Sequence, residues 1–215
     1  MDRDLSRYLR RYTTLSSALD TLLNKRLVLL SPAKWDDQND VRFMELYRAS
    51  SQIGSVLALC FARTRETYHH WRVFTQGMEG VCLEFHHAEL SHTVNSTLGV
   101  EARNVDYLLV RELKELTPAD LERLPFVKRD GYKDEREWRI IAHLEEEAVQ
   151  TKPLPIDITA ISRVILNPWM PPPLAKNLRE IIKGLPGCGK LKIEASRLTN
   201  SDEWKAAGSR VANLR

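Results

Sequence analysis

The segment Lys128–His143, KRDGYKDEREWRIIAH, constrains the fold most, because an acid-rich turn runs directly into an apolar run that starts at Trp138. The apolar run is typical of a strand, in which successive side chains point to opposite faces. Glu135, Glu137 and Arg139 are therefore predicted to share one face of this strand. Like charges on one face repel each other, so the two carboxylates indicate either a solvated strand end or a site for a cationic group. We favour the second interpretation.

The composition is that of a folded globular protein. The chain has 215 residues, of which 43% are apolar and 28% charged, so it can bury a core and is not expected to be disordered. We predict a single domain over residues 1–199, followed by a polar, peripheral tail over residues 200–215. The formal net charge of +3 is compatible with nucleotide or nucleic-acid partners but does not require them. The oligomeric state is left open.

Cysteine usage and the N-terminal residues indicate the compartment. Cys60, Cys82 and Cys188 are far apart and form no Cys-x-x-Cys pair, which argues against a disulfide framework and a structural zinc site. The first residues, MDRDLSRYLRRY, are charged where a signal peptide needs an apolar core. No run reaches the roughly 18 apolar residues of a membrane-spanning helix. We therefore predict a cytoplasmic protein with no membrane partner.

Short strands mixed irregularly with short helices are predicted along the chain. Thr14 is expected to cap a helix that follows a first strand at residues 7–13, and the polar residues 33–43 are expected to form a turn. Further strands are predicted at residues 27–30, 55–61, 80–85, 104–108, 138–144, 161–166 and 191–196, helices at 43–51, 117–124 and 174–183, and a helical turn or loop at 69–75. This order favours an α+β fold with mixed, mostly antiparallel sheets and short flanking helices.

The segment Gly184–Lys190, GLPGCGK, matches the core of a phosphate-binding loop but lacks its context. That loop follows a strand, precedes a helix and carries Ser or Thr after the lysine to hold magnesium. Here a helix is predicted before the segment, a strand after it, and Leu191 follows the lysine. Glycines that end a helix and turn into a strand explain the pattern, so we predict a turn and not a phosphate site.

Other candidate sites stay open on these residues alone. The run of residues 36–40, DDQND, is compatible with a metal- or ribose-binding loop and equally with a plain turn. The basic-aromatic clusters at residues 8–12 and 71–74 are compatible with nucleotide stacking or with half-buried packing. Ser31 lies in no nucleophile motif. The six histidines form no metal-binding motif, and His70 is the histidine most expected to be buried.

The order of these motifs resembles the bacterial domain-of-unknown-function family 2971, from Tyr8 to Ile141 and more weakly over residues 161–166. Two departures weaken roles that need a carboxylate or a hydroxyl: residues 41–43 read VRF where the family has Pro-Phe-Glu, and Phe74 stands where it has tyrosine. The matching positions are Arg11-Tyr12, Ser31-Pro32, Asn39-Asp40, Cys60-Phe61, Trp71, Gly80-Val81-Cys82, Tyr107, Lys128 and Glu135-Arg136-Glu137-Trp138-Arg139.

The same order is also similar to compact ADP-ribosyltransferases, which implies an ADP-ribosyltransferase-like fold and NAD as co-substrate. In that class an Arg or His on the first strand holds the NAD diphosphate or ribose, and a serine, tyrosine or other aromatic residue stacks on the nicotinamide. A late glutamate stabilises the positive charge that develops on the ribose when the glycosidic bond breaks. No metal is expected.

Carried onto this chain, the resemblance implies a role for each matching residue. Glu137 would be the catalytic carboxylate, and Glu135 would position the acceptor. Arg139 would keep both carboxylates ionised and, with Lys128, would contact the substrate. The cofactor side would comprise Arg11 on phosphate, Tyr12 or Trp71 against the nicotinamide, Asn39 or Asp40 near a ribose, and Ser31 as a further cofactor-binding residue.

We therefore predict an NAD-dependent ADP-ribosyltransferase-like protein that acts on a nucleic-acid or protein acceptor, in a bacterial toxin or phage-defence setting. This interpretation requires Arg11, Tyr12 and Glu137 to meet in one cleft. The alternative is a non-catalytic domain that binds a nucleotide or a partner protein, with the charged residues as a structural network. A third alternative, a metal-dependent nuclease, requires four carboxylates to converge: Asp36, Asp40, Glu135 and Glu137.

Overall fold

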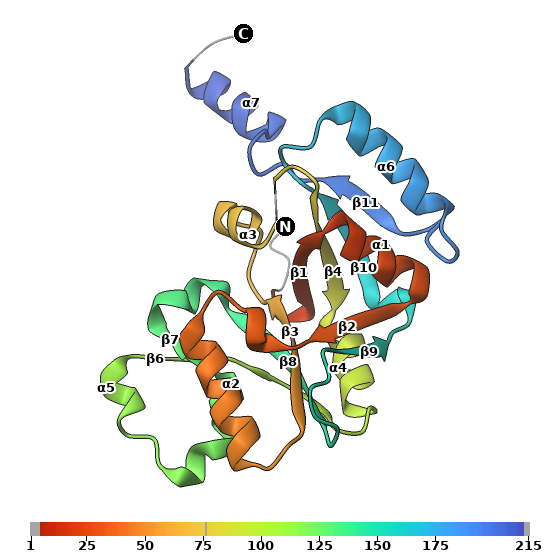
Figure 1. Cartoon of the computed structure of the whole chain (residues 1–215). Helices are drawn as coiled ribbons and strands as arrows, with labels where there is room; N and C mark the ends of the chain where they lie inside the picture. Colours follow the sequence, from red (N-terminus) through yellow and green to blue (C-terminus); the bar gives the residue numbers. More distant parts are fainter. Residues whose placement is uncertain (1–4, 76, 213–215) are drawn as a thin grey trace.

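The computed structural model describes residues 5–75 and 77–212 (Figure 1). The strands are β1 (Tyr8–Thr14), β2 (Arg26–Leu30), β3 (Ser55–Ala62), β4 (Gly80–His86), β5 (Val100–Asn104), β6 (Asp106–Leu108), β7 (Val127–Arg129), β8 (Glu137–Leu144), β9 (Thr151–Pro155), β10 (Ile161–Leu166) and β11 (Lys192–Ala195). The α-helices are α1 (Leu15–Asn24), α2 (Gln38–Ser50), α3 (Tyr68–Phe74), α4 (His87–Asn95), α5 (Val110–Leu113), α6 (Pro172–Gly184) and α7 (Asp202–Val211). The 3-10 turns are η1 (Leu5–Arg7), η2 (Pro32–Lys34), η3 (Pro118–Phe126), η4 (Asp130–Glu135) and η5 (Ile158–Ala160).

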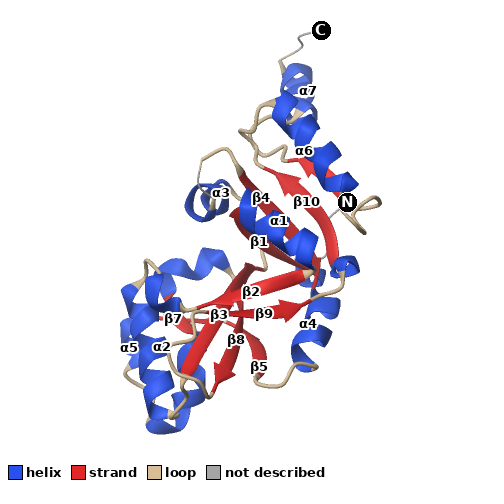
Figure 2. Ribbon diagram, turned by 45° about the vertical axis from the view of Figure 1, so that its right-hand side comes forward, coloured by secondary structure: helices blue, strands red, loops and turns tan. Residues whose placement is uncertain are grey.

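The fold is α+β with a mostly antiparallel sheet, as the sequence predicts. Within the described residues a nine-stranded sheet runs in the order β11-β10-β4-β1-β3-β2-β9, and β8 joins it by pairing with both β3 and β5. The neighbours β10 and β11 are parallel, whereas the long pairs β1–β4, β3–β8 and β5–β8 are antiparallel. The short strands β6 and β7 form a separate parallel pair. Figures 1 and 2 show α6 and α7 at one end of the molecule and α2 and α5 at the other.

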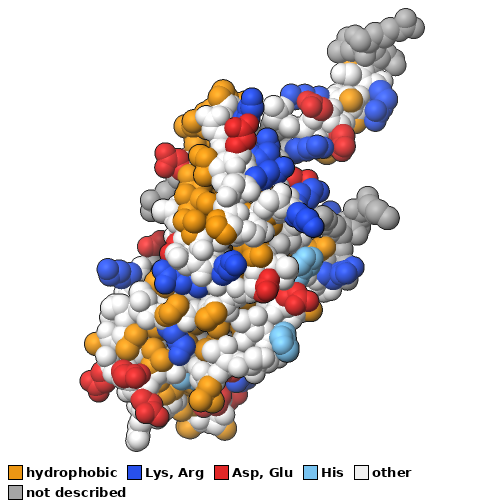
Figure 3. All heavy atoms as spheres, turned by 90° about the vertical axis from the view of Figure 1, so that its right-hand side faces the viewer, with side chains coloured by type: hydrophobic (Ala, Val, Ile, Leu, Met, Phe, Trp, Pro, Cys, Tyr) orange, Lys and Arg blue, Asp and Glu red, His pale blue; other side chains and the backbone are white. Residues whose placement is uncertain are grey.

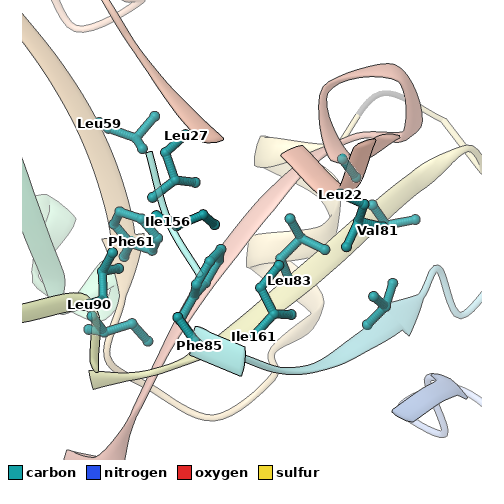
Figure 4. Packing of buried hydrophobic residues seen from close by; sticks show 14 of the residues in the cluster. Leu22, Leu27, Leu59, Phe61, Val81, Leu83, Phe85, Leu90, Ile156 and Ile161 are labelled. Atoms are coloured by element: carbon teal, nitrogen blue, oxygen red, sulfur yellow. The ribbon is translucent and has the colours of Figure 1, made fainter. Parts of the chain in front are cut away.

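One face of the sheet carries the main hydrophobic core. Apolar side chains of β3 and β4 alternate along their strands, so that every second one enters this core. Phe61 of β3 and Phe85 of β4 meet edge to face, with ring centroids 5.5 Å apart. In Figure 4 they lie near Leu90 of α4, whereas Leu22 of α1, in the same cluster, lies beside Val81 of β4. Helices α1, α4 and α6 thus cover this face, because each contributes buried residues to the same cluster.

The opposite face of the sheet is covered in two separate places. Met44 of α2 belongs to a second cluster on β3 and β8, whereas Trp71 of α3 belongs to a third cluster with Tyr12 of β1. Between these clusters β3 presents Cys60, whose register partner on β8 is Arg139. Polar side chains therefore occupy the part of this face that neither helix cluster covers.

The two halves of the sheet meet along a narrow seam. Strand β1 pairs with β4 along its whole length, from Tyr8 to Thr14. In contrast, β1 and β3 are registered within the described residues only at Arg10 and Ala62. The half that contains β1, β4, β10 and β11 is therefore joined to the half that contains β3, β8 and β5 by few backbone hydrogen bonds.

Several element boundaries differ from the predictions. The turn predicted for residues 33–43 instead includes the start of α2, because the Asp37 side chain accepts a hydrogen bond from the Asn39 amide at 3.0 Å and caps the helix. The strand predicted at 104–108 is split at Val105 into β5 and β6. Helix α4 and strand β9 were not predicted, because their sequences are rich in histidine or proline.

The segment with the phosphate-loop pattern is a turn, as predicted. Helix α6 ends at Gly184, and β11 begins at Lys192. Gly187 has a φ of +85°, a left-handed conformation that glycine adopts at no steric cost. The segment thus joins a helix to a strand, which is the reverse of the order that a phosphate-binding loop needs.

The C-terminal residues form a helix where the sequence predicts only a polar tail. Helix α7 is capped by Ser201, whose hydroxyl accepts from the Trp204 amide at 3.3 Å, and none of its residues is buried. The division between a domain and a tail at residue 199 stays a prediction. Residues 1–4 and 213–215, which belong to the predicted N-terminal segment and tail, lie outside the described residues.

Charge is dispersed over the part of the surface that Figure 3 shows. Basic side chains lie among acidic and apolar ones on this face and do not form one continuous stripe, in line with the small formal net charge of +3. In the part of the chain that the structure describes, no helix combines the length and the apolar character that crossing a membrane requires.

Substitution of Gly54 by alanine is expected to destabilise the protein. A Cβ atom at this position would lie 2.0 Å from the Glu145 carbonyl oxygen, so the backbone must move. We expect the free energy of unfolding, measured with urea, to fall by about 1–3 kcal/mol. The matched control is Gly208→Ala in α7, where a Cβ meets nothing within 4 Å. Equal unfolding midpoints for the two variants would contradict this packing.

Candidate functional site

A cavity of about 380 Å³ lies on the second face of the sheet, between α2 and α3. Arg11, Tyr12 and Glu137 all line it, so the geometric condition that the transferase interpretation requires is met. Four further predicted site residues also line the cavity: Asp40, Lys128, Glu135 and Arg139.

Three predicted site residues do not line this cavity. Ser31 caps η2 by accepting from the Ala33 amide at 3.4 Å. Asn39 points its amide at Asp37 Oδ1, 2.9 Å away. Trp71 is 0% exposed and donates from Nε1 to Glu66 at 2.6 Å. Each side chain is thus engaged in local structure, and we assign no ligand contact to any of the three.

The pairing of β3 with β8 places the charged residues. Glu137 and Arg139 are two residues apart on β8, so they share a face, and their register partners on β3 are Ala62 and Cys60. The small side chains on β3 leave room above this face for long charged ones. The alternation of side chains along β8 therefore places both Glu137 and Arg139 at the cavity, as the sequence predicts.

Glu135 reaches the same cavity by a different route from the predicted one. It ends the 3-10 turn η4 and is not part of the strand. The next residue, Arg136, adopts a left-handed conformation (φ 44°, ψ 53°), so the strand-like alternation assumed for Glu135 and Glu137 does not apply. Both glutamates are nevertheless buried, at 6% and 5% exposure, while the Arg136 side chain between them is exposed.

Arg139 is the centre of the charged cluster. Its Nη1 and Nη2 donate to Asp40 Oδ1 and Oδ2 at 2.8 and 2.7 Å, and its Nε donates to Glu137 Oε1 at 2.6 Å. Nη1 also donates to the Pro125 carbonyl at 2.7 Å. The guanidinium carbon lies 4.9 Å from the centre of the Trp35 ring. One fully buried side chain thus joins α2, β8 and the end of η3.

Lys128 links the two glutamates. Its Nζ donates to Glu135 Oε2 at 2.6 Å and to Glu137 Oε2 at 3.4 Å, and it lies 4.7 Å from the centre of the Tyr132 ring. The cationic groups that the two carboxylates indicated in the sequence are therefore, in this structure, side chains of the protein itself. The repulsion between the carboxylates is offset by Lys128 and Arg139 together.

The two glutamates differ in their acidity. Burial acts to raise the pKa of Glu137, but Arg139 and Lys128 outweigh it and hold this pKa at about 2. Burial also raises the pKa of Glu135, and here Lys128 does not fully compensate. Glu137 is thus firmly ionised, whereas Glu135 takes up a proton more readily. In enzymes, environments that separate the pKa values of two carboxyl groups in this way set which group carries a proton and which stays ionised.

Arg11 provides a further positive charge at the cavity. Its Nη1 donates to the Cys60 carbonyl at 3.1 Å, and among the described residues no carboxylate pairs with it. Burial accordingly lowers the pKa of Arg11. Neighbouring Arg10, in contrast, is paired with Glu84 at 2.7 Å. A half-buried guanidinium with unused N–H donors is suited to bind phosphate or another anion.

An aromatic wall stands beside Arg11. The Tyr12 ring lies 5.2 Å from that of His70, and the Trp71 ring packs edge-on behind Tyr12 at 5.1 Å. Of the Tyr12 and Trp71 rings, that of Tyr12 lines the cavity and that of Trp71 does not. The Tyr12 hydroxyl and His70 Nε2 are buried and have no hydrogen-bond partner within the described residues. Buried polar atoms ordinarily pair with protein, water or a ligand.

Among the lining residues that sequence reasoning did not assign to the site are three with aromatic rings: Trp35, Tyr132 and His70. Trp35 and Tyr132 stack on Arg139 and Lys128, and both stand as single aromatic residues in polar, acid-rich turns. An aromatic side chain in such a turn has no local apolar neighbours and must pack on another segment. The isolated position of Trp35 and of Tyr132 in polar turns was therefore the sequence feature that could have predicted their packing at the site.

The carboxylates that a metal-dependent nuclease would need do line one cavity, including Asp36. Asp40 and Glu137 are bound by Arg139, and Glu135 is bound by Lys128. Within the described residues no group of three or more histidine, cysteine, aspartate or glutamate side chains is arranged to hold a metal ion. A metal ion would therefore have to displace both cations from these carboxylates.

Comparison with known proteins gives structural neighbours only. No family model matches the sequence, and no curated protein matches it, so the resemblance to family 2971 stays a prediction. Similar solved structures are Thermus sp. 2.9 DarT in complex with NAD+ (9% identity, TM-score 0.46, 88% of this chain and 95% of that one) and with ADP-ribosylated single-stranded DNA (10%, 0.47, 92% and 98%). Similarity at this level assigns no ligand, activity or residue role to the present chain.

Replacement of Arg139 by methionine is expected to destabilise the fold strongly. The substitution leaves Asp40 and Glu137 buried without their cation, and breaking a buried pair of this kind costs about 3–5 kcal/mol. Urea unfolding would measure the loss. The control is Arg42→Met, because Arg42 is 63% exposed and its pair with Glu45 spans 3.5 Å, for which we expect a change within about 0.5 kcal/mol. Similar losses for both variants would count against the cluster as a stabilising centre.

The two glutamates are expected to affect stability at different pH values. The pKa of Glu137 is depressed in the folded state, from 4.5 to about 2. Its contribution, on the order of 3 kcal/mol, is therefore present above pH 4.5 and lost as the pH falls towards 2. The pKa of Glu135 is raised, so that group opposes stability as the pH rises above 4.5. Urea unfolding at several pH values should show a shallower acid loss in Glu137→Gln, and no such flattening in Glu135→Gln.

Proposed function

We propose that the protein binds NAD in this cavity and transfers ADP-ribose to an acceptor, as an NAD-dependent ADP-ribosyltransferase. The observation that carries the proposal is the meeting of Arg11, Tyr12 and Glu137 at one cavity. These residues lie on β1 and β8, which are far apart in the sequence, so no local motif accounts for their meeting. A volume of about 380 Å³ is within the range of small-molecule sites.

The charge distribution along the cavity matches the requirements of NAD cleavage. The cations Lys128 and Arg139 face three carboxylates, those of Asp40, Glu135 and Glu137, so this cluster keeps one net negative charge. Arg11, which also lines the cavity, is a cation without a carboxylate partner among the described residues. The diphosphate would bind at Arg11, and the ribose that gains positive charge in the transition state would face Glu137.

The proposed reaction is a substitution at the ribose carbon that carries the nicotinamide. The bond between this carbon and the pyridinium nitrogen breaks, and its electron pair leaves with neutral nicotinamide. Glu137 stabilises the oxocarbenium-like ribose through its charge, and Arg139 holds this carboxylate in place at 2.6 Å. A nucleophilic oxygen or nitrogen of the acceptor forms the new bond and loses its proton. Glu135, whose pKa is raised by burial, is the proposed recipient of that proton.

The second candidate function is a non-catalytic domain that binds a nucleotide or a partner protein. One observation favours it: Asp40, Glu135 and Glu137 each accept a hydrogen bond from a buried cation. A cluster of this kind also serves as a purely structural network. Under this alternative the cavity still binds a nucleotide at Arg11, but Glu137 has no role in bond cleavage.

The proposed acceptor is a nucleic acid or a protein, and the proposed setting is a bacterial toxin or phage-defence system in the cytoplasm. The support for the setting is the resemblance of the sequence motifs described above. The support for a charged acceptor is the formal net charge of +3, which favours association with nucleic acid but does not select it.

Calorimetry with NAD and an assay of NAD consumption with cell extract would test this function. We expect Arg11→Gln to weaken NAD binding about ten- to a hundredfold, because hydrogen bonds to a charged group are lost. Glu137→Gln should lower NAD consumption on the order of 10²- to 10³-fold and leave NAD affinity within a few-fold of the wild type. The control for charge removal is Arg42→Gln on the exposed side of α2, which should change neither quantity.

The outcomes separate the candidate functions. Binding of NAD that depends on Arg11, without consumption under any condition, would select the non-catalytic alternative. Absence of both binding and consumption in the wild type would overturn the proposal. Thermal unfolding of each variant should accompany these measurements, because Glu137 belongs to a buried network and its substitution also affects stability.

A further inference from the structure

A second pocket, of about 430 Å³, lies at the start of β8 and shares Glu137 with the first cavity. Three of its lining residues are basic: Arg63, Lys133 and Arg136. Glu137 is the sole acidic residue that lines it within the described residues, and its carboxylate is bound by Arg139. The second pocket is therefore positive, in contrast to the charged cluster of the first cavity, in which carboxylates outnumber cations.

The arginines of this pocket have unused hydrogen-bonding capacity. Arg63 donates from Nη1 to Asn104 Oδ1 at 2.6 Å, and its Nε is buried without a partner within the described residues. Arg136 forms no side-chain hydrogen bond or ion pair with the described residues. Lys133 shares its charge with Asp130 at 3.2 Å. Like charges repel when gathered in one pocket, and a bound anion relieves that repulsion.

The backbone at Arg136 explains how the two pockets receive opposite charges. Arg136 has a φ of 44°, a left-handed conformation that a non-glycine residue adopts at a cost in strain and only where the surrounding structure holds it. The conformation leaves Glu135 and Glu137 at the first cavity and places Arg136 at the second pocket. The Arg136 carbonyl accepts from the Arg63 amide at 2.9 Å, which fixes the two arginines next to each other.

We infer that the second pocket is a phosphate-binding site, in which Arg63 and Arg136 hold a phosphate group beside the start of β8. Guanidinium groups suit this role because their planar set of N–H donors matches two phosphate oxygens at once. The role of this phosphate rests on the proposed function: Arg11 takes the diphosphate of NAD, so a phosphate in the second pocket belongs to the acceptor. This acceptor phosphate is one of the backbone of a single-stranded nucleic acid, and free phosphate, which offers the same oxygens, is the other source of the same chemistry.

The variant Arg136→Gly provides the sharpest test. Glycine adopts the left-handed conformation without strain, so the substitution removes the guanidinium while the backbone is kept, and thermal stability should not fall. Arg63→Gln is the second variant, which removes a charge from the other side of the pocket. Arg42→Gln, on α2 and outside both pockets, is the control for loss of a surface charge.

Two probes distinguish the sources of the phosphate: inorganic phosphate by calorimetry, and a labelled single-stranded oligonucleotide by fluorescence anisotropy at several salt concentrations. We expect each arginine variant to weaken binding of the effective probe about ten- to a hundredfold. For the oligonucleotide, the slope of log affinity against log salt should fall by about 0.7 for each phosphate contact removed. The control variant should bind like the wild type.

Each outcome has a definite meaning. Binding of phosphate alone supports a site for free phosphate, and binding of the oligonucleotide supports a nucleic-acid acceptor. If the wild type binds neither probe, or if both arginine variants bind as tightly as the wild type, the inference is overturned. NAD binding by the wild type is measured separately at the first cavity, so the proposed function can hold while this inference fails.

Discussion

The interaction on which the rest of the structure depends is the set of hydrogen bonds from the buried guanidinium of Arg139. It joins Asp40 of α2, Glu137 of β8 and the Pro125 carbonyl at the end of η3, three segments that also pack together through a hydrophobic cluster. Because a buried charge is costly without partners, the positions of all three segments are coupled. The same bonds hold the Glu137 carboxylate at the cavity, so the stability of the fold and the proposed chemistry both depend on this cluster.

Much of the fold follows from patterns that are local in the sequence. Apolar runs predict β3, β4 and β10, and Thr14 as a helix cap follows from its hydroxyl, which accepts from the Ser17 amide. What the sequence does not contain is the pairing of β8 with β3 on one side and β5 on the other, because such registers depend on distant segments. The start of α2 was missed for a different reason: Asp37 suits a turn and a helix cap equally well.

The candidate site was predictable at its charged residues and not at its packing residues. Glu137 and Arg139 could be placed together because strand alternation is a local rule. Glu135 joined them through the left-handed conformation of Arg136, which no pattern indicated. The resemblance implied Trp71 as one of two candidates to face the nicotinamide, but its side chain is fully buried behind Tyr12. For an aromatic residue in a basic segment, the sequence does not show whether the ring faces a cavity or packs in the core.

The narrow seam between the two halves of the sheet has a thermodynamic consequence. Arg11 and Tyr12 lie on one side of the seam, where β1 is registered with β3 only at Arg10 and Ala62 among the described residues, and Glu137 lies on the other. A molecule that contacts both sides acts as a non-covalent cross-link between halves that share few backbone hydrogen bonds. By linkage, a ligand present at a hundred times its dissociation constant adds about 2.7 kcal/mol to the stability of the folded chain. Binding in the cavity and the stability of the sheet are therefore thermodynamically coupled.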